Sequence, residues 1–216
     1  MSVQTQTLSD IACTVPGATD LFNDYNLDFF LNGKQQLKVA LANAKIDKAA
    51  FLFKLTNLEQ AESKSHFNWQ TQSPIKLVAH IIDNFHEKHR IQFRQLLHLC
   101  KVVQEKNPHK EYFPQHLESH LSQMRYELEE HMMKEEAILF PMIMKGFYPS
   151  GPISVMEAEH LEHAAALDKL SELTQQFTPP ADADDNWRLL YTQTKQLYND
   201  LKEHIHLENN ILFSQR

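Results

Sequence analysis

The sequence predicts an all-α protein in which a small helical module precedes an up-down-up-down four-helix bundle. Only four of the 216 residues are glycine, and long stretches lack both glycine and proline. Apolar residues recur every three or four positions over most of the chain, which is the period of a helix buried along one side. Short segments rich in proline, glycine and polar residues interrupt this pattern, and they favour several separate helices over one long coiled coil.

The first element is expected over residues 1–58. One set of apolar positions ends near Tyr25, Asn32 and Gly33 mark a turn or helix stop, and a second set runs from Leu37 to Leu55. This pattern predicts the small helical module. Residues 59–73 are polar and aperiodic and are predicted to be a linker, so the bundle is expected over residues 74–216.

Four apolar stripes then follow in the chain. They run from Ile75 to Val103, from Leu117 to Met142, from Ile153 to Phe177 and from Trp187 to Ile211. In the last three stripes the steps alternate between three and four residues, as in helices that pack at a shallow crossing angle. Ile75 and Ile138 belong to these stripes and are therefore expected to face the core.

Histidine and glutamate interrupt every stripe. The interruptions are His86 with His89, His131 with Glu135, His160 with His163, and His204 with Glu208. Two of these pairs lie in copies of one motif, H-x-x-x-E-x-x-I-L-F, at residues 131–140 and 204–213. Residues four apart project from the same side of a helix. Each copy should therefore place its histidine and glutamate side by side, and the bundle is predicted to be a tandem repeat of two helical hairpins.

A buried pair of carboxylates needs a compensating charge. An unpaired buried carboxylate costs several kcal/mol, and no lysine or arginine lies in the stripes near the interruptions. A metal ion could compensate, and four histidines with two glutamates suit two cations bridged by carboxylates. The candidate ligands are His86, His131, Glu135, His160, His204 and Glu208. Mixed imidazole and carboxylate ligands on a four-helix bundle favour iron, with manganese second.

The same residues also allow a simpler interpretation, in which each histidine is an ordinary hydrogen-bonded core residue and each pair an ordinary ion pair. The complete set favours the metal, because two copies in register and two further histidines all fall inside apolar stripes. His89 and His163 lie one turn from proposed ligands and could support them or bind metal themselves. Glu135 and Glu208 are expected to face each other across the core, Glu136 is expected to be dispensable, and His206 should point elsewhere.

Composition excludes several classes of function. The formal net charge is −7 and no block of lysine and arginine is present, so nucleic acid is not an expected partner. No apolar run approaches the ~20 residues that span a bilayer. The N-terminus resembles no secretory signal, and a cytoplasmic location is expected. Cys13 and Cys100 form no C-x-x-C pair and are expected to be reduced thiols.

Three long strings carry a resemblance to a known family. They are "HMMKEEAILFPMI", "GPISVMEAEH" and "HIHLENNILF", and they follow a shorter string, "LFNDYNLDF". Together they resemble the RIC (repair of iron centres) proteins of the YtfE/ScdA type, in which a short helical domain precedes a hemerythrin-like domain. The resemblance covers nearly the whole chain.

The resemblance implies a function, a cofactor and partners. It implies a cytoplasmic homodimer that restores iron–sulfur clusters damaged by nitric oxide or oxidants, so its partners would be damaged iron–sulfur proteins. It also implies a non-haem di-iron centre with oxo and carboxylate bridges, held by the same six residues as above. The protein would then be a repair protein or iron donor rather than a conventional enzyme with catalytic residues.

The N-terminal module departs from the family pattern. Family members usually carry adjacent cysteines followed by two glycines, whereas this chain reads "LDFFLNGKQQL". Phe29 and Phe30 replace the thiols, only Gly33 remains of the glycine pair, and Cys13 is not an obvious substitute. The module could instead serve in packing or dimerisation.

Three other functions remain open from the residues alone. The bundle could be a hemerythrin-like carrier or sensor of oxygen or nitric oxide, a nitric oxide reductase at the same two irons, or a structural bundle without metal. The H-x-x-x-E pair that closes the chain differs from the H-x-x-x-x-D pair usual in hemerythrins, which argues against reversible oxygen carriage.

Overall fold

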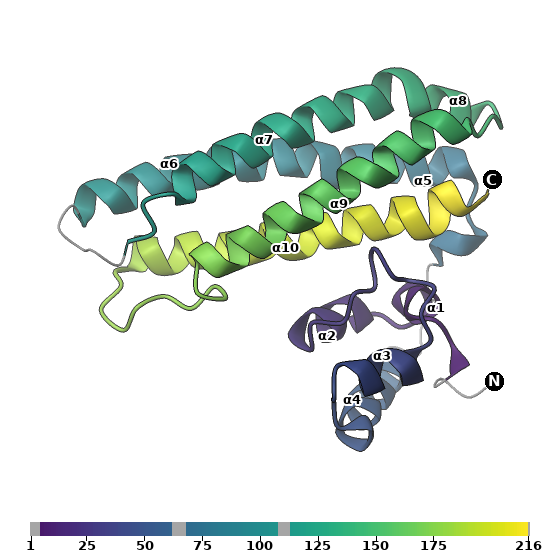
Figure 1. Cartoon of the computed structure of the whole chain (residues 1–216), viewed down its shortest axis with the longest axis horizontal. Coiled ribbons are helices and arrows are strands. Elements are labelled where there is room, and N and C mark those ends of the chain that lie inside the picture. The colour runs from purple at the N-terminus through teal and green to yellow at the C-terminus, as the bar shows by residue number, and fades with distance from the viewer. Residues whose placement is uncertain (1–4, 62–67, 108–112, 216) are drawn as a thin grey trace. The chain divides into compact units, whose positions relative to one another are not determined.

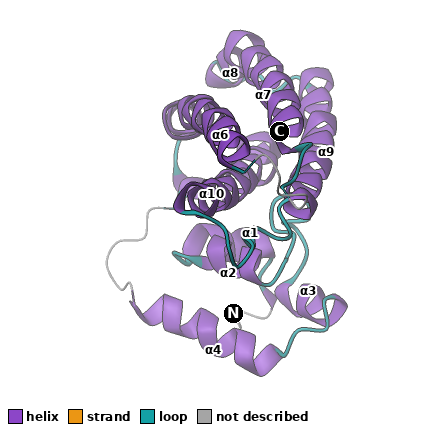
Figure 2. Ribbon diagram, turned by 90° about the vertical axis from the view of Figure 1, so that its left-hand side faces the viewer, coloured by secondary structure: helices purple, strands orange, loops and turns teal. Residues whose placement is uncertain are grey.

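The computed structural model describes residues 5–61, 68–107 and 113–215, and these residues are mostly helical (Figures 1 and 2). Within these ranges the only β-type pairing is an isolated bridge between Thr7 and Gln36. The all-α prediction is confirmed. The chain divides into two compact units: residues 78–201, and residues 1–77 together with 202–216. Helix α10 (Asp185–Leu207) contributes residues to both units.

The unit of residues 78–201 is built from long helices. These are α6 (Glu87–Lys106), α7 (Leu117–Lys134), α9 (Ser150–Leu173) and the first part of α10. Helix α7 packs against both α6 and α9, and Figure 1 shows the long helices lying lengthwise beside one another. Consecutive helices run in opposite directions, as short connections require, so the fold is the predicted up-down-up-down bundle.

The other unit contains the short N-terminal helices. These are α1 (Leu8–Thr14), α2 (Ala18–Asp24), α3 (Leu37–Asn43) and α4 (Lys48–Ala61). Thr7 and Asp10 form a capping box that begins α1. Phe22, Phe29 and Phe51 form the aromatic core, with the Phe22 and Phe51 rings stacked at 6.3 Å between centroids. Residues 62–67 of the expected linker lie outside the described residues, and the short 3₁₀ helix η2 (Trp69–Thr71) follows.

Three π-helical turns interrupt the long helices. They are η3 (Ile82–His86) between α5 (Pro74–Ile81) and α6, η4 (Glu135–Leu139) between α7 and α8 (Phe140–Met144), and η5 (Glu208–Leu212) between α10 and the 3₁₀ helix η6 (Phe213–Gln215). A π turn carries one residue more than an α-helical turn and so rotates the residues on either side relative to each other.

These turns explain two wrong expectations about the core. Ile75 and Ile138 were expected to face it, but their exposed fractions are 56% and 55%. Ile75 precedes the first π turn and Ile138 lies inside the second. A strict period of three or four residues does not allow for this rotation, and the burial of a rotated side chain then depends on the neighbouring elements.

No helix among the described residues combines the length and the apolar character needed to cross a membrane.

Candidate metal centre

Each π turn places a candidate ligand at one of its ends. His86 is the last residue of η3, Glu135 the first of η4 and Glu208 the first of η5. Single π turns inside α-helices occur frequently at functional sites, because the extra residue redirects one side chain without ending the helix. In this chain all three redirected residues are buried and ionisable.

Within residues 78–201, Glu135 lies between two histidines. Its Oε2 atom is 3.5 Å from His86 Nε2 and 3.5 Å from His131 Nε2. His160 completes the cluster, with its Nε2 atom 3.1 Å from His131 Nε2. All four side chains are at most 1% exposed. The imidazole Nε2 atoms therefore converge with a carboxylate in a space closed to bulk solvent.

The outer nitrogens of two of these histidines are held by carboxylates. His86 Nδ1 donates a hydrogen bond to Glu136 Oε1 at 2.7 Å, and His131 Nδ1 donates to Glu159 Oε2 at 2.9 Å. A neutral imidazole that donates from Nδ1 keeps a lone pair on Nε2. Both rings therefore present a lone pair toward Glu135, which is the arrangement that histidine ligands of metals commonly adopt.

Both outer carboxylates have charged neighbours. Partial burial by itself would raise the pKa of Glu159, but hydrogen bonds from Lys134 and His131 bring this pKa below its ordinary value. Glu136 is paired with Arg90, whose Nη2 atom lies 3.0 Å from Glu136 Oε1. An ionised carboxylate is the stronger acceptor for the imidazole N–H.

Glu136 is thus in direct contact with a candidate ligand, a contact that the expectation of a dispensable Glu136 did not include. That expectation assumed that a residue next to Glu135 must point away from the cluster. Glu136 does point outward, but η3 brings His86 to it from the side. No sequence spacing indicates such a contact, and the same is true of Glu159 with His131.

Within the other unit, the second copy of the motif forms the expected pair. His204 Nε2 lies 3.1 Å from Glu208 Oε1, and both side chains are buried. His206 points away from this pair, as expected. It contacts Cys13 and Asn210 instead.

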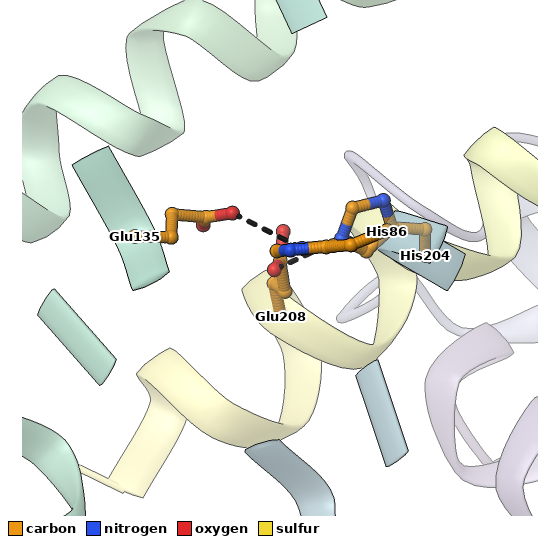
Figure 3. A group of neighbouring side chains, drawn as sticks. All are labelled: His86, Glu135, His204 and Glu208. Carbon is orange, nitrogen blue, oxygen red and sulfur yellow. Dashed lines mark hydrogen bonds and ion pairs between the residues drawn. The ribbon is translucent and has the colours of Figure 1, made fainter. Parts of the chain in front are cut away.

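The six candidate ligands fall into two overlapping groups of four. One group is His86, Glu135, His204 and Glu208, and the other is His131, Glu135, His160 and Glu208. In each group one ligand atom from every residue lies within 4.8 Å of the others, and Figure 3 shows the first group. Glu135 and Glu208 belong to both groups. Imidazole nitrogens and carboxylate oxygens in this proportion fit iron, manganese or zinc and provide no soft sulfur ligand.

His89 and His163 are buried but belong to neither group. His89 Nδ1 donates to Gln92 Oε1 at 2.9 Å, and Gln92 Nε2 donates to the buried Asp200 at 2.6 Å. The His163 ring packs edge-on against His131, with 4.9 Å between centroids. Both histidines therefore support the bundle beside the cluster.

The two thiols take no part in the cluster. Burial raises the pKa of Cys13 and of Cys100 to about 12 in each case, and both are free cysteines. They therefore stay protonated at neutral pH, and a protonated thiol is a poor metal ligand and nucleophile.

Comparison with known proteins identifies the family. Residues 80–215 match the family described as "Hemerythrin HHE cation binding domain", and residues 4–59 match the ScdA_N domain, which is described as a domain of unknown function. The chain is 40% identical over 215 residues to "Iron-sulfur cluster repair protein YtfE" of Musicola paradisiaca, a match that covers 99% of this chain and 96% of that protein. The chain belongs to the YtfE-type iron–sulfur cluster repair (RIC) family.

Two further relatives of this family are covered to a similar extent. The chain is 42% identical over 215 residues to "Iron-sulfur cluster repair protein YtfE" of Yersinia pestis, covering 99% of this chain and 97% of that protein. It is 40% identical over 216 residues to "Probable iron-sulfur cluster repair protein" of Haemophilus influenzae, again covering 99% and 97%. The resemblance seen in the sequence is confirmed, and the bundle carries a hemerythrin-like cation-binding domain.

Proposed function

We propose that the protein binds two iron ions in the bundle and takes part in the repair of damaged iron–sulfur clusters. The observation that carries this proposal is the position of Glu135, whose Oε2 atom is equally distant from His86 and His131. A carboxylate in that position can bridge two cations. The names of the relatives supply the link to cluster repair.

The ligands would be divided between the two ions. His86 and His204 would hold one, His131 and His160 the other, and Glu135 and Glu208 would bridge them. The carboxylates Glu136 and Glu159 would keep His86 and His131 in the tautomer that binds. Burial of all six ligands would exclude bulk water. When bound, the iron would supply ions for a damaged cluster or a binding place for a small molecule such as nitric oxide.

The proposed partners are iron–sulfur proteins whose clusters have been damaged by nitric oxide or by oxidants. Ferrous iron would be cargo in such a reaction. Carboxylate ligands suit this role, because they can change between bridging and terminal binding while the histidines stay fixed.

The test uses an iron–sulfur dehydratase inactivated by nitric oxide or by peroxide. Adding the iron-loaded protein should restore dehydratase activity faster than the same amount of free ferrous iron. Glu135→Leu protein should give no gain over free iron. If wild-type protein, variant and free iron all restore activity equally, the repair function is wrong.

Three further features belong to this proposal. We expect a homodimer, a cytoplasmic location, and a module at residues 1–58 joined by residues 59–73 to the bundle at residues 74–216. The two family matches, over residues 4–59 and 80–215, are compatible with these boundaries. Light scattering coupled to size exclusion would test the dimer, and a mass equal to one chain would exclude it.

A further inference from the structure

The segment that carries His204 and Glu208 has a second side, which contacts the N-terminal module. Residues 202, 206 and 210 are spaced four apart, so they share one side of the helix, while 204 and 208 lie on another. Lys202 and His206 are buried although neither belongs to the metal-binding groups. Lys202, His206 and Asn210 each contact residues of the N-terminal module.

Asn210 makes the closest of these contacts. Its side-chain Nδ2 donates to the backbone carbonyl of Phe30 at 2.9 Å and to that of Phe29 at 3.2 Å. The amide has two N–H groups, and its Nδ2 atom also lies 3.2 Å from His206 Nδ1, so the two carbonyls and this ring nitrogen together use its donor capacity. Adjacent carbonyls in an irregular loop have no ladder partner, so an amide that satisfies both fixes the loop to the helix.

Gly33 shows how tightly this loop encloses Asn210. A Cβ atom added at Gly33 would lie 2.4 Å from Asn210 Oδ1 and 2.6 Å from its Cγ atom. No side chain can occupy that space while Asn210 keeps its position. The glycine is required here by the close approach of Asn210, not by a left-handed backbone, because Gly33 is not among the positive-φ glycines. We call Asn210, the carbonyls of Phe29 and Phe30, and Gly33 the Asn210 anchor.

Aromatic packing surrounds the anchor. The His206 ring meets Phe29 edge-on with 5.6 Å between centroids, and Lys202 Nζ lies 5.3 Å from the centre of the Phe30 ring. Cys13 Sγ is 3.6 Å from His206 Nε2. The loop therefore meets the helix through packing and hydrogen bonds, without a reactive thiol.

We propose that Asn210 is a positioning residue, through which the N-terminal module holds the π turn that begins at Glu208. Asn210 lies two residues inside η5. A π turn is rarely stable by itself, so contacts elsewhere must select it. The anchor supplies such contacts from the side opposite His204 and Glu208. In this chain the module serves to fix a ligand-bearing turn. This inference rests on the proposed metal centre.

Two variants test the anchor from its two sides. In Asn210→Asp the shape is kept, but the carboxylate cannot donate and places a negative charge against two carbonyls. In Gly33→Ala the added methyl group displaces Asn210 from the loop side, 175 residues from Glu208 and without a change in charge. Gly151→Ala is the matched control, because a Cβ at Gly151 meets nothing within 4 Å.

The first measurement is hydrogen exchange of the metal-free protein. In both variants we expect amides of residues 204–213 to exchange at least tenfold faster, while amides of the first motif copy at 131–140 keep their wild-type rates. The second measurement is the release of bound iron to a ferrous chelator, which should be at least threefold faster in both variants. Gly151→Ala should match wild type in both.

Several outcomes would overturn the inference. Wild-type exchange at 204–213 in a folded variant would show that the anchor does not hold the turn. Equal acceleration in both motif copies would show only general destabilisation. If one variant does not fold, the other decides, and if neither folds the anchor is a folding element and not a positioning device. Because the exchange measurement needs no iron and no repair assay, failure of the repair function would leave its result intact.

Discussion

The two copies of H-x-x-x-E-x-x-I-L-F have the same local backbone but different surroundings. In both copies a π turn of five residues begins at the glutamate, and the histidine and glutamate are buried. Charged contacts surround the first copy: Glu159 pairs with His131, and Arg90 pairs with Glu136. Around the second copy lie the packed aromatic side chains and backbone carbonyls of the N-terminal module.

The isoleucine of the motif shows this difference most clearly. Ile138 in the first copy is 55% exposed, whereas Ile211 in the second copy is 2% exposed. The local sequence and the π turn are the same at both positions. The motif therefore determines which side chains face the cluster, and the neighbouring elements determine whether the other side chains of the motif are buried or exposed.

The largest expected effect concerns the two glutamates and would show that the copies are equivalent at the cluster. Glu135→Leu and Glu208→Leu should each lower bound iron from about two per chain to below one, because each removes a ligand shared by both groups. Elemental analysis of natively purified protein measures this. Glu130→Leu, at an exposed position of α7, should keep full iron content. Full iron in either test variant would exclude bridging by that residue.

The same two substitutions should have the opposite effect on the metal-free protein. A buried carboxylate costs desolvation energy that leucine does not. The free energy of unfolding of the metal-free variants should therefore exceed that of metal-free wild type by about 1–4 kcal/mol. Calorimetry of chelator-treated samples checks this. Lower stability in both variants would mean that other contacts already compensate the carboxylates.

A difference between the copies is expected at the isoleucine. Ile211→Ala should lower the free energy of unfolding by about 2–5 kcal/mol, because it opens a cavity. Ile138→Ala should change it by no more than about 0.5 kcal/mol, because the side chain is mostly in solvent. Urea unfolding of the two variants compares them directly. Equal losses would contradict the difference in burial.

Substitution of the outer carboxylates should have a smaller effect on metal binding, because they contact only His131 of the first copy and His86. Glu159→Gln and Glu136→Gln should each weaken metal binding about 10–100-fold, because a neutral amide accepts less strongly from His131 or His86. Competition with a chelator gives the affinity. Glu129→Gln is the control, since Glu129 pairs with Arg90 at 3.0 Å and not with a candidate ligand histidine. A comparable loss in Glu129→Gln would mean that general charge, not the histidine contact, sets the affinity.

The smallest effect is expected at Cys13, the thiol beside the second copy. Cys13→Ala should leave the iron content unchanged, because the thiol is protonated and outside the cluster.

The alkylation rate of Cys13 should depend on pH. Because its pKa is about 12, this rate in the folded protein should rise about tenfold per pH unit from pH 7 to 10. In urea the rate should level off above an ordinary thiol pKa of about 8.5. Mass spectrometry of alkylated samples measures both, and a plateau near pH 8.5 in the folded protein would contradict the raised pKa.

Much of the candidate site was predictable from the sequence because it depends on local spacing. His131 with Glu135 and His204 with Glu208 are four residues apart, and that spacing places each pair on one side of a helix in any fold. The apolar stripes around them implied burial, and burial of carboxylates implied a compensating cation. The helical class followed from the same periodicity and from the scarcity of glycine.

The sequence by itself thus determined the helical class, the motif copies and the six candidate ligands of this protein. Only the tertiary structure decided which residues from other elements contact the candidate ligands and the second motif copy. Glu136 reaches His86 from a neighbouring helix, Glu159 reaches His131 in the same way, and Asn210 binds a loop 180 residues away. The π turns also escaped prediction, since a strict helical period cannot show where one extra residue is accommodated. Contacts between elements depend on how helices pack, and the periodicity of one helix does not indicate which residues of another helix will contact it.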